Sequence, residues 1–543
     1  MGNKKDHSQR TLILFKNVPM KPNIVQVLFI SLLFGINGCN ESPEKSRKAK
    51  SNTSAVLDKK LNVLFIIADD LNCDLGIYGN NVVKTPNIDR LAQRGIVFEN
   101  AHNQYPLCGP SRASFMTGMY TNQTKITENN MNLRNSVPDV TTLGQRFRQQ
   151  GYQSVRIGKI FHYDNPSAIG TSGNDDIYSW DQTVNPYGRD KIEEYKINTL
   201  IPRRYGGTLS WLAADGDDEE QTDGIGANEA IKKLDDFSKS NTPFFLAVGF
   251  FRPHTPFVAP KKYFDLYKRD AIEIPESSNE YLKTLPKPAA KSIRAQKSQL
   301  NLEKEVAQEI KEAYYATISF VDTQVGRVLD HLEASGLNEN TIVVFTSDHG
   351  YHMGEHGHWQ KQTLFENATR VPLIISMPYT VSTTAKAKRS MSPVELIDLY
   401  PTLMELTKIE TPQHVVGKSL QAVMQNEKTS VRGSALTRWR NGYTIKTRRY
   451  RITKWGANGE LGYELYDHKN DEKELLNLAS NQAYKTVMDS LKQVLDQRIF
   501  EASVKPDGLG RQIDNAKTVP KAKNITFGDL HDAQGKRIYL KEK

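Results

Sequence analysis

The sequence predicts an α/β fold built around a large, mostly parallel sheet. Nearly continuous apolar runs recur along the chain, at residues 61–68, 243–250, 341–346 and 371–376. Strands that are buried on both faces have this composition, because helices cover both sides of a parallel sheet. Helical patterns lie between these runs, and such an alternation of strand and helix is typical of a doubly wound α/β core.

The first apolar run, residues 61–68, is followed directly by Asp69 and Asp70. Open α/β sheets place their functional sites at the carboxyl ends of the strands. Two adjacent carboxylates repel each other, and a divalent cation is the obvious compensation. The alternative interpretation is a turn or a helix cap, where Asp is common.

A short cysteine motif, Cys108-Gly109-Pro110-Ser111-Arg112, comes after a helix that Thr85, Pro86 and Gly95 delimit over residues 85–95. Pro110 suits the first position of a further helix, so Cys108 is predicted just before a helix N-terminus, where free N–H groups favour an anion. Arg112 adds a fork of donors suited to an oxyanion. The alternative is a small buried cysteine in a turn.

Ionisable side chains also follow the other predicted strands. Lys159 and His162 come after a strand at 152–157, and His254 comes after the run at 243–250, between two prolines. Because the carboxyl ends of parallel strands share one edge of the sheet, we expect a single site there. The predicted site consists of Asp69, Asp70, Cys108, Arg112, Lys159, His162, His254, Asp348, His349 and Lys361.

The segment 349–361 also holds further histidines, which could suggest zinc. Its glycines interrupt any helical i, i+4 face, and it lacks the ligand trio of hydrolytic zinc sites, so we do not predict zinc. Residues 164–225 and 258–303 show weak periodicity and are predicted to be irregular segments that set specificity. Apolar spacing over 305–332 predicts a long packing helix.

The pattern changes near residue 430, which we take as the end of a catalytic domain over 59–430. Four short strands and a closing helix predict a smaller α+β subdomain with an antiparallel sheet over 431–510. An irregular basic tail follows at 511–543. The net charge of +10 lies in the two ends of the chain. The near-neutral body gives no support for a nucleic-acid partner.

The N-terminus predicts export. The apolar run at 24–36 behind a basic start is too short to span a bilayer and is typical of a signal peptide, here 1–39. Ile36-Asn37-Gly38-Cys39 resembles a bacterial lipoprotein processing site, which predicts lipidation of Cys39 and a membrane anchor, with 40–58 as a flexible linker. Ordinary secretion is the alternative. Either way, the predicted location is the periplasm or cell envelope of a bacterium.

Taken together, these motifs resemble the type I sulfatase family, and within it the iduronate-2-sulfatase branch. The strings that carry the second resemblance are Gly158–His162, Pro253–Phe257, Thr346–Gly350 and Gly354–Gly357. The resemblance implies an alkaline-phosphatase-like sandwich and oxidation of Cys108 to formylglycine by a maturation enzyme. It also implies one Ca²⁺, held by Asp69, Asp70, modified Cys108, Asp348 and His349.

By the same resemblance, a hydroxyl group of hydrated formylglycine attacks sulfur, and Arg112 orients this hydrate. Lys159, Lys361 and His254 then bind the sulfate oxygens. His254 donates a proton to the departing sugar oxygen, and His162 assists or contacts the sugar. An unmodified thiolate suits the reaction poorly, because the covalent linkage that it would form with the sulfate group has no easy route of breakdown.

The implied function is hydrolysis of sulfate from a sulfated sugar or polysaccharide fragment, by exo-action on a 2-O-sulfated uronic acid or a related residue. Phosphonate or phosphodiester monoesterases of the same superfamily share the cysteine motif and remain an alternative. A zinc alkaline phosphatase is disfavoured, because its nucleophile is Ser or Thr and its ligands include more histidines. A glycan-binding surface lipoprotein with a decayed site is the alternative from outside the enzymes.

Overall fold

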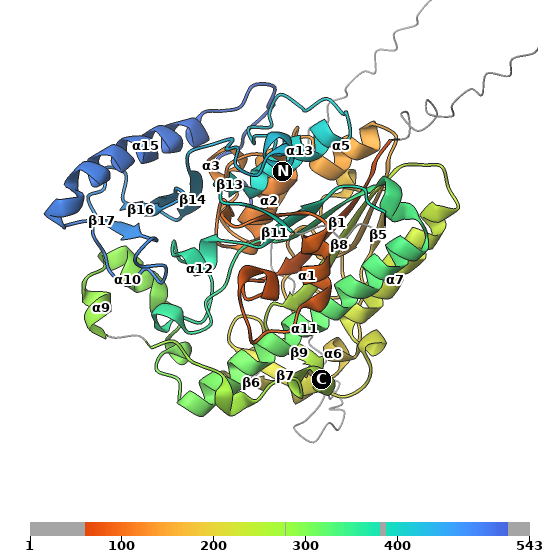
Figure 1. Cartoon of the computed structure of the whole chain (residues 1–543), viewed down its shortest axis with the longest axis horizontal. Coiled ribbons are helices and arrows are strands. Elements are labelled where there is room, and N and C mark those ends of the chain that lie inside the picture. The colour runs from red at the N-terminus through yellow and green to blue at the C-terminus, as the bar shows by residue number, and fades with distance from the viewer. Residues whose placement is uncertain (1–59, 203, 277–278, 381–386, 520–543) are drawn as a thin grey trace, which may run out of the picture. The chain divides into compact units, whose positions relative to one another are not determined.

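The computed structural model describes residues 60–202, 204–276, 279–380 and 387–519 (Figure 1). Within them, an eight-stranded sheet has the order β12-β2-β11-β10-β1-β8-β4-β5. All neighbouring pairs are parallel except those of β11, which runs antiparallel to β10 and β2. The predicted α/β class with a mostly parallel sheet is therefore confirmed. The strands are β1 Asn62–Asp69, β2 Ile96–Phe98, β4 Gln153–Gly158, β5 Gln182–Val184, β8 Phe244–Pro253, β10 Thr341–Ser347, β11 Leu373–Ser376 and β12 Lys388–Ser390.

Helices cover both faces of this sheet, as a parallel sheet requires. Along β1, Leu64, Ile66 and Ala68 pack toward one cluster and the alternate residues toward the other. The first cluster includes α1 (Pro86–Gln93), α7 (Thr222–Ser238) and α11 (Lys304–Ala334). The second includes α2 (Cys108–Thr117), α5 (Leu143–Gln149) and α13 (Leu399–Leu406). Phe115 of α2 meets Phe65 of β1 with ring centroids 6.2 Å apart.

One predicted cap is wrong. Thr85 makes no side-chain cap bond to α1, and its hydroxyl group instead accepts from the N–H of Gly76. Asp322 of α11 takes its place, because its carboxylate accepts from the N–H groups of Asn87 and Ile88. A carboxylate is favoured at a helix N-terminus by the free N–H groups and the helix dipole.

The segment 164–225 is less irregular than predicted. It supplies β5 to the main sheet and contains β6 (Asn198–Thr199) and β7 (Ser210–Ala214). These two strands form a small sheet with β9 (Phe257–Pro260). The other short elements are β3 Ala101–His102, α3 Thr121–Thr124, α4 Leu133–Ser136, α6 Arg189–Ile192, α8 Lys261–Phe264, α9 Asn279–Lys283, α10 Lys287–Ile293, α12 Glu366–Thr369, β13 Val394–Glu395 and α14 Gln421–Gln425.

The smaller C-terminal unit has the predicted antiparallel sheet. Its strands β14 (Ala435–Trp439), β15 (Gly442–Lys446), β16 (Tyr450–Trp455) and β17 (Gly462–Asp467) are adjacent in chain order. Helix α15 (Lys485–Ser503) packs on this sheet through an apolar cluster that also includes Tyr120 and Ile397 (Figure 1). The predicted signal peptide, Cys39, the linker to residue 58 and the tail beyond 519 lie outside the described residues. Among the described helices, none is both long and apolar enough to cross a membrane.

Candidate active site

The predicted site residues meet at the carboxyl edge of the sheet, in a largely buried cluster. Asp69 ends β1, and Asp348 follows β10, which pairs with β1 in parallel. Lys159 follows β4, and His254 follows β8. The Asp69, Lys159 and Asp348 side chains are fully buried, and His254 is 7 % exposed. The strand-end argument therefore placed these residues correctly.

Cys108 lies in the middle of this cluster and is the first residue of α2. The helix therefore begins two residues before its predicted start at Pro110, and Cys108 lies within its first turn rather than ahead of it. Its Sγ atom lies 3.2 Å from Nε2 of His349, 3.4 Å from Nζ of Lys361 and 3.8 Å from Oδ1 of Asp70. Burial raises the pKa of the Cys108 thiol well above its ordinary value, although Lys361 opposes the shift. An unmodified Cys108 would therefore be a neutral thiol at physiological pH and a poor nucleophile.

Arg112 connects several residues of the cluster through hydrogen bonds and ion pairs. Its guanidinium donates to Asp348 at 2.9 Å and to Asp69 at 3.0 Å, and its remaining contacts are the carbonyl groups of Lys159 and Ile160. All these groups are buried, so each bond is made without competition from water. In the structure, Arg112 thus fixes two aspartates relative to α2, and each of its three nitrogen atoms donates to a protein oxygen.

Two lysines pair with the other carboxylate oxygens. Lys159 Nζ lies 2.5 Å from Asp69 Oδ2, and Lys361 Nζ lies 2.6 Å from Asp70 Oδ1. Burial would raise the pKa of Asp69, but Lys159 and other cationic neighbours hold it well below its ordinary range. Burial raises the pKa of Asp70 despite the charge of Lys361. The ionised form of Asp70 is therefore undercompensated, and a further cation at this carboxylate would stabilise it.

The arrangement fits a divalent cation. Candidate ligand atoms of Asp69, Asp70, Cys108 and His254 lie within 4.8 Å of one another, as do those of Cys108, Asp348 and His349. Nδ1 of His349 lies 3.0 Å from the Gly350 carbonyl and donates to it, which leaves the lone pair of Nε2 facing the cluster. Three aspartates supply the oxygen donors that Ca²⁺ prefers.

The two other histidines lie at the exposed side of the cluster. Nδ1 of His254 lies 2.6 Å from the carbonyl of Thr255, and Nε2 lies 3.7 Å from Asp70. Burial and the charge of Lys361 lower the pKa of His254 well below its ordinary value. Nε2 of His162 lies 3.3 Å from Asp164, and burial lowers the pKa of His162 to about 4. Both rings are therefore neutral near pH 7 in the absence of an anion.

Three groups contribute to this site without having been predicted. Ser111 donates to the Asp348 carbonyl at 2.5 Å, and Ser347 donates to the His349 carbonyl at 2.8 Å. Tyr314 of α11 donates to the Asp70 carbonyl at 2.9 Å. The serines lie inside the predicted motifs and could have been inferred from them, whereas Tyr314 gives no sequence signal.

The remaining histidines of the segment after β10 form no metal group among the described residues. His356 stacks on Phe365 with ring centroids 4.1 Å apart, and His352 bonds to Thr363. His358 contacts the carbonyl groups of Ile293 and Lys361. In this structure the three rings pack against neighbouring side chains or bond to protein oxygens.

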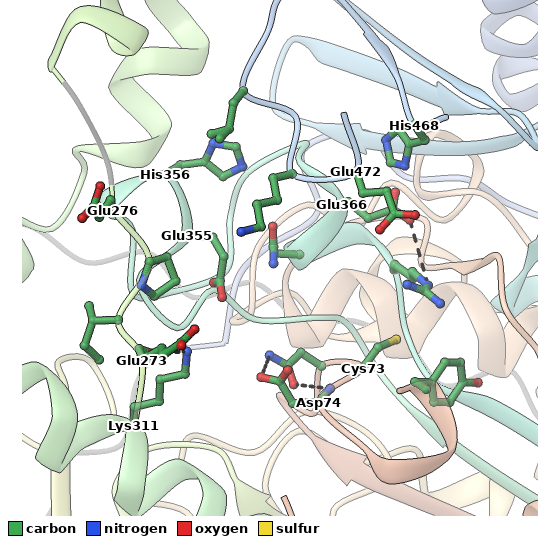
Figure 2. A pocket seen from close by; sticks show the side chains of 18 of the residues that line it. Cys73, Asp74, Glu273, Glu276, Lys311, Glu355, His356, Glu366, His468 and Glu472 are labelled. Atoms are coloured by element: carbon green, nitrogen blue, oxygen red, sulfur yellow. Dashed lines mark hydrogen bonds and ion pairs between the residues drawn. The ribbon is translucent and has the colours of Figure 1, made fainter. Parts of the chain in front are cut away.

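A cavity of about 1610 Å³ is lined by Asn72, Cys73 and Asp74, which follow Asp70 in the chain, but by none of the predicted site residues. Figure 2 shows Asp74, Glu355 and Glu366 among the side chains in its walls. Candidate metal-ligand atoms of Glu366, His468 and Glu474 lie within 4.8 Å of one another. Arg451 already pairs with both glutamates, so these groups form an ion-pair network that joins α12 to the C-terminal sheet.

Comparison with known proteins identifies the family to which this chain belongs. The family model described as Sulfatase matches residues 61–409, well over half of the chain. The chain belongs to the sulfatase family. A second model, described as N-sulphoglucosamine sulphohydrolase, C-terminal, matches residues 354–501 of this sulfatase. The enzyme is therefore a sulfuric ester hydrolase, as the motifs predicted.

Individual relatives agree with this assignment. A sulfatase of Formosa agariphila is 35% identical, covering 80% of this chain and 86% of the relative. Iduronate 2-sulfatase of Mus musculus is 33% identical, covering 73% of this chain and 76% of the relative. Among solved structures, phosphonate monoester hydrolase of Agrobacterium radiobacter superposes with a TM-score of 0.67 at 22% identity, covering 82% of this sulfatase and 96% of that chain. This last likeness shows the shared fold alone.

Proposed function

We propose that this sulfatase removes sulfate from the non-reducing end of a sulfated polysaccharide fragment, with a 2-O-sulfated uronic acid or a related sugar as the terminal residue. The observation that carries the proposal is the buried cluster of three aspartates, two lysines and Arg112 around Cys108. The likeness to iduronate 2-sulfatases of mouse and human, at 33% and 34% identity, supports the choice of sugar.

Cys108 is proposed to act as formylglycine after oxidation by a maturation enzyme. The neutral, buried thiol of the unmodified residue supports this proposal, because it lacks the thiolate that a cysteine nucleophile needs. Asp69, Asp70 and Asp348, together with Nε2 of His349 and the modified residue 108, would hold one Ca²⁺. When bound, this cation supplies Lewis-acid polarisation of the oxygen atoms that react at sulfur.

The residues of the chain itself then have separate tasks. The ammonium groups of Lys159 and Lys361 stabilise the negative charge that spreads over the sulfate oxygens. Nδ1 of His254 is held by the Thr255 carbonyl, so Nε2 is the atom that delivers a proton to the departing sugar oxygen. The pKa of His254 is lowered in the free protein, and the negative charge of a bound sulfate opposes this shift by favouring the protonated ring.

A screen of defined sulfated oligosaccharides tests this proposal. We expect sulfate release from a non-reducing terminal 2-O-sulfated residue and little release from internal positions. Release from internal positions of long chains, with none from the ends, would contradict exo-action. Parallel rates on an aryl sulfate and on a phosphodiester separate the sulfatase from the phosphodiesterase alternative, which predicts the faster rate on the phosphodiester.

Removal of calcium should inactivate the enzyme reversibly. We expect chelation to abolish hydrolysis and to lower Tm, because Asp70 then loses its compensating cation. Adding back Ca²⁺ should restore both, with the Tm rising with Ca²⁺ concentration. Asp70→Asn should lose this Ca²⁺-dependent rise in Tm, whereas Asp139→Asn, which alters an exposed ion pair, should keep it. A wild-type Tm indifferent to Ca²⁺ would refute the assigned ligands.

A further inference from the structure

Tyr351 carries a buried hydroxyl group beside the catalytic cluster that bonds to nothing among the described residues. Its side chain is fully buried. A buried hydroxyl group without a partner loses its hydrogen bonds to water and gains none in return, so such groups are rare in folded proteins. A phenylalanine would fill the same space without this cost. The hydroxyl group is therefore expected to meet a partner that the chain itself does not supply.

The position of Tyr351 is fixed by its surroundings. Gly350 packs so closely that a Cβ atom there would lie 2.0 Å from the Asn367 carbonyl oxygen, and its N–H donates to Ala368. The Tyr351 ring stacks on Tyr314 with centroids 5.8 Å apart and meets Phe257 edge-on at 6.3 Å. These two ring contacts hold the Tyr351 side chain in one orientation and so fix the direction of its hydroxyl group.

Ionisable groups of the catalytic cluster act on the Tyr351 hydroxyl group. Burial is the main cause that raises the pKa of Tyr351, and the ionisable groups that act on it are Asp70, Lys361 and Cys108. Tyr351 is thus a neutral donor at physiological pH. Lys361 Nζ and Cys108 Sγ lie 3.4 Å apart, and Lys361 also pairs with Asp70. Tyr314, on which the Tyr351 ring stacks, donates to the Asp70 carbonyl, so the ring packs against the end of β1 that carries Asp70. The Tyr351 hydroxyl group itself bonds to none of Asp70, Lys361 and Cys108.

We propose that the Tyr351 hydroxyl group donates a hydrogen bond to an oxygen atom of the sulfate group while that group is held at residue 108. The proposal rests on the sulfatase reaction at this residue. Sulfate brings oxygen acceptors to the point where Lys361 and residue 108 meet, and negative charge on these oxygens increases as the ester bond breaks. A preorganised neutral donor stabilises that negative charge without changing the net charge of the aspartates and lysines around it.

Tyr351→Phe tests this role, because it removes only the hydroxyl group. Since the hydroxyl group bonds to none of the described residues, we expect the Tm of the variant to be equal to or above that of the wild type. We expect kcat/KM on an aryl sulfate to fall about 10- to 100-fold, as for loss of a hydrogen bond to a charged group. The inhibition constant of inorganic sulfate should rise, and the shape of the pH–rate profile should stay unchanged.

Tyr152→Phe is the matched control. Tyr152 lies just before β4 at the opposite edge of the sheet, and its hydroxyl group donates to the Leu61 carbonyl at 3.1 Å. This variant should lose stability and keep kcat/KM, the reverse of Tyr351→Phe. A Tyr351→Phe enzyme with wild-type kcat/KM and wild-type sulfate inhibition would overturn the inference, as would a lowered Tm without ligand. A wild-type enzyme that hydrolyses no sulfate ester would instead refute the proposed function itself.

Discussion

Cys108→Ala is expected to lower kcat/KM on sulfate esters by at least about 10⁴-fold, the scale on which loss of a catalytic nucleophile is felt. The side chain of residue 108 is the common neighbour of His349, Lys361 and Asp70, so nothing else can take its place in the cluster. The variant should still fold, because alanine suits a helical position and leaves the ion pairs intact. Circular dichroism and kcat/KM on an aryl sulfate check the two halves of this expectation.

Cys108→Ser separates a formylglycine from any other use of the side chain. In a host whose maturation enzyme accepts only cysteine, this variant should be inactive, although it keeps a hydroxyl group in place. Mass spectrometry of the wild-type peptide that contains residue 108 should show a mass below that of the unmodified cysteine peptide. Retained activity of Cys108→Ser in such a host would refute the formylglycine mechanism.

Cys73→Ser is the control for these substitutions. Cys73 is a free, half-buried thiol that lines the neighbouring cavity shown in Figure 2. Burial raises the pKa of its thiol to about 12, so it is unreactive, and its replacement should leave kcat/KM unchanged.

The positions of the site residues were predictable because each depends on a local pattern and one topological rule. Asp69 and Asp348 each close a buried apolar strand, and parallel strands end at the same edge of a sheet. The same rule placed Lys159 and His254. Nothing more than strand order is needed for this step, and the apolar runs reveal the strands directly.

The partners of these residues were not predictable, because they depend on contacts between distant segments. The sequence motif predicts that Arg112 holds an oxyanion, yet the fold brings Asp348 to it across 236 positions. The cap of α1 comes from Asp322, 235 positions beyond Asn87. A sequence motif shows which side chains are present at a helix start, but only the packed structure shows which donors are already occupied.

The irregular-looking segment 164–225 illustrates a second limit. Its strand β5 has three residues and joins the edge of the main sheet, with only partial burial. A short, half-exposed edge strand carries neither an apolar run nor a clear alternation, so its composition resembles that of a loop. Its structure is imposed by pairing with β4, which does have a recognisable pattern.

Arg112→Met is expected to destabilise the fold by about 3–5 kcal/mol, the cost of leaving a buried charge unpaired. The substitution keeps much of the side-chain volume but leaves the buried carboxylates of Asp69 and Asp348 without their guanidinium partner. Urea unfolding measures the loss. Arg511→Met is the control, because Arg511 also makes paired contacts to a carboxylate, that of Asp139, but at an exposed site where water replaces them.

A second substitution tests the physical cause of that loss. If the unpaired charge is responsible, Asp348→Asn added to Arg112→Met should recover part of the lost stability, because it removes one of the stranded carboxylates. Strictly additive losses in the double variant would show that Arg112 acts through packing alone. Activity should not return in either case, since Asp348 is one of the proposed calcium ligands. Stability and catalysis thus depend on the same carboxylate for different reasons.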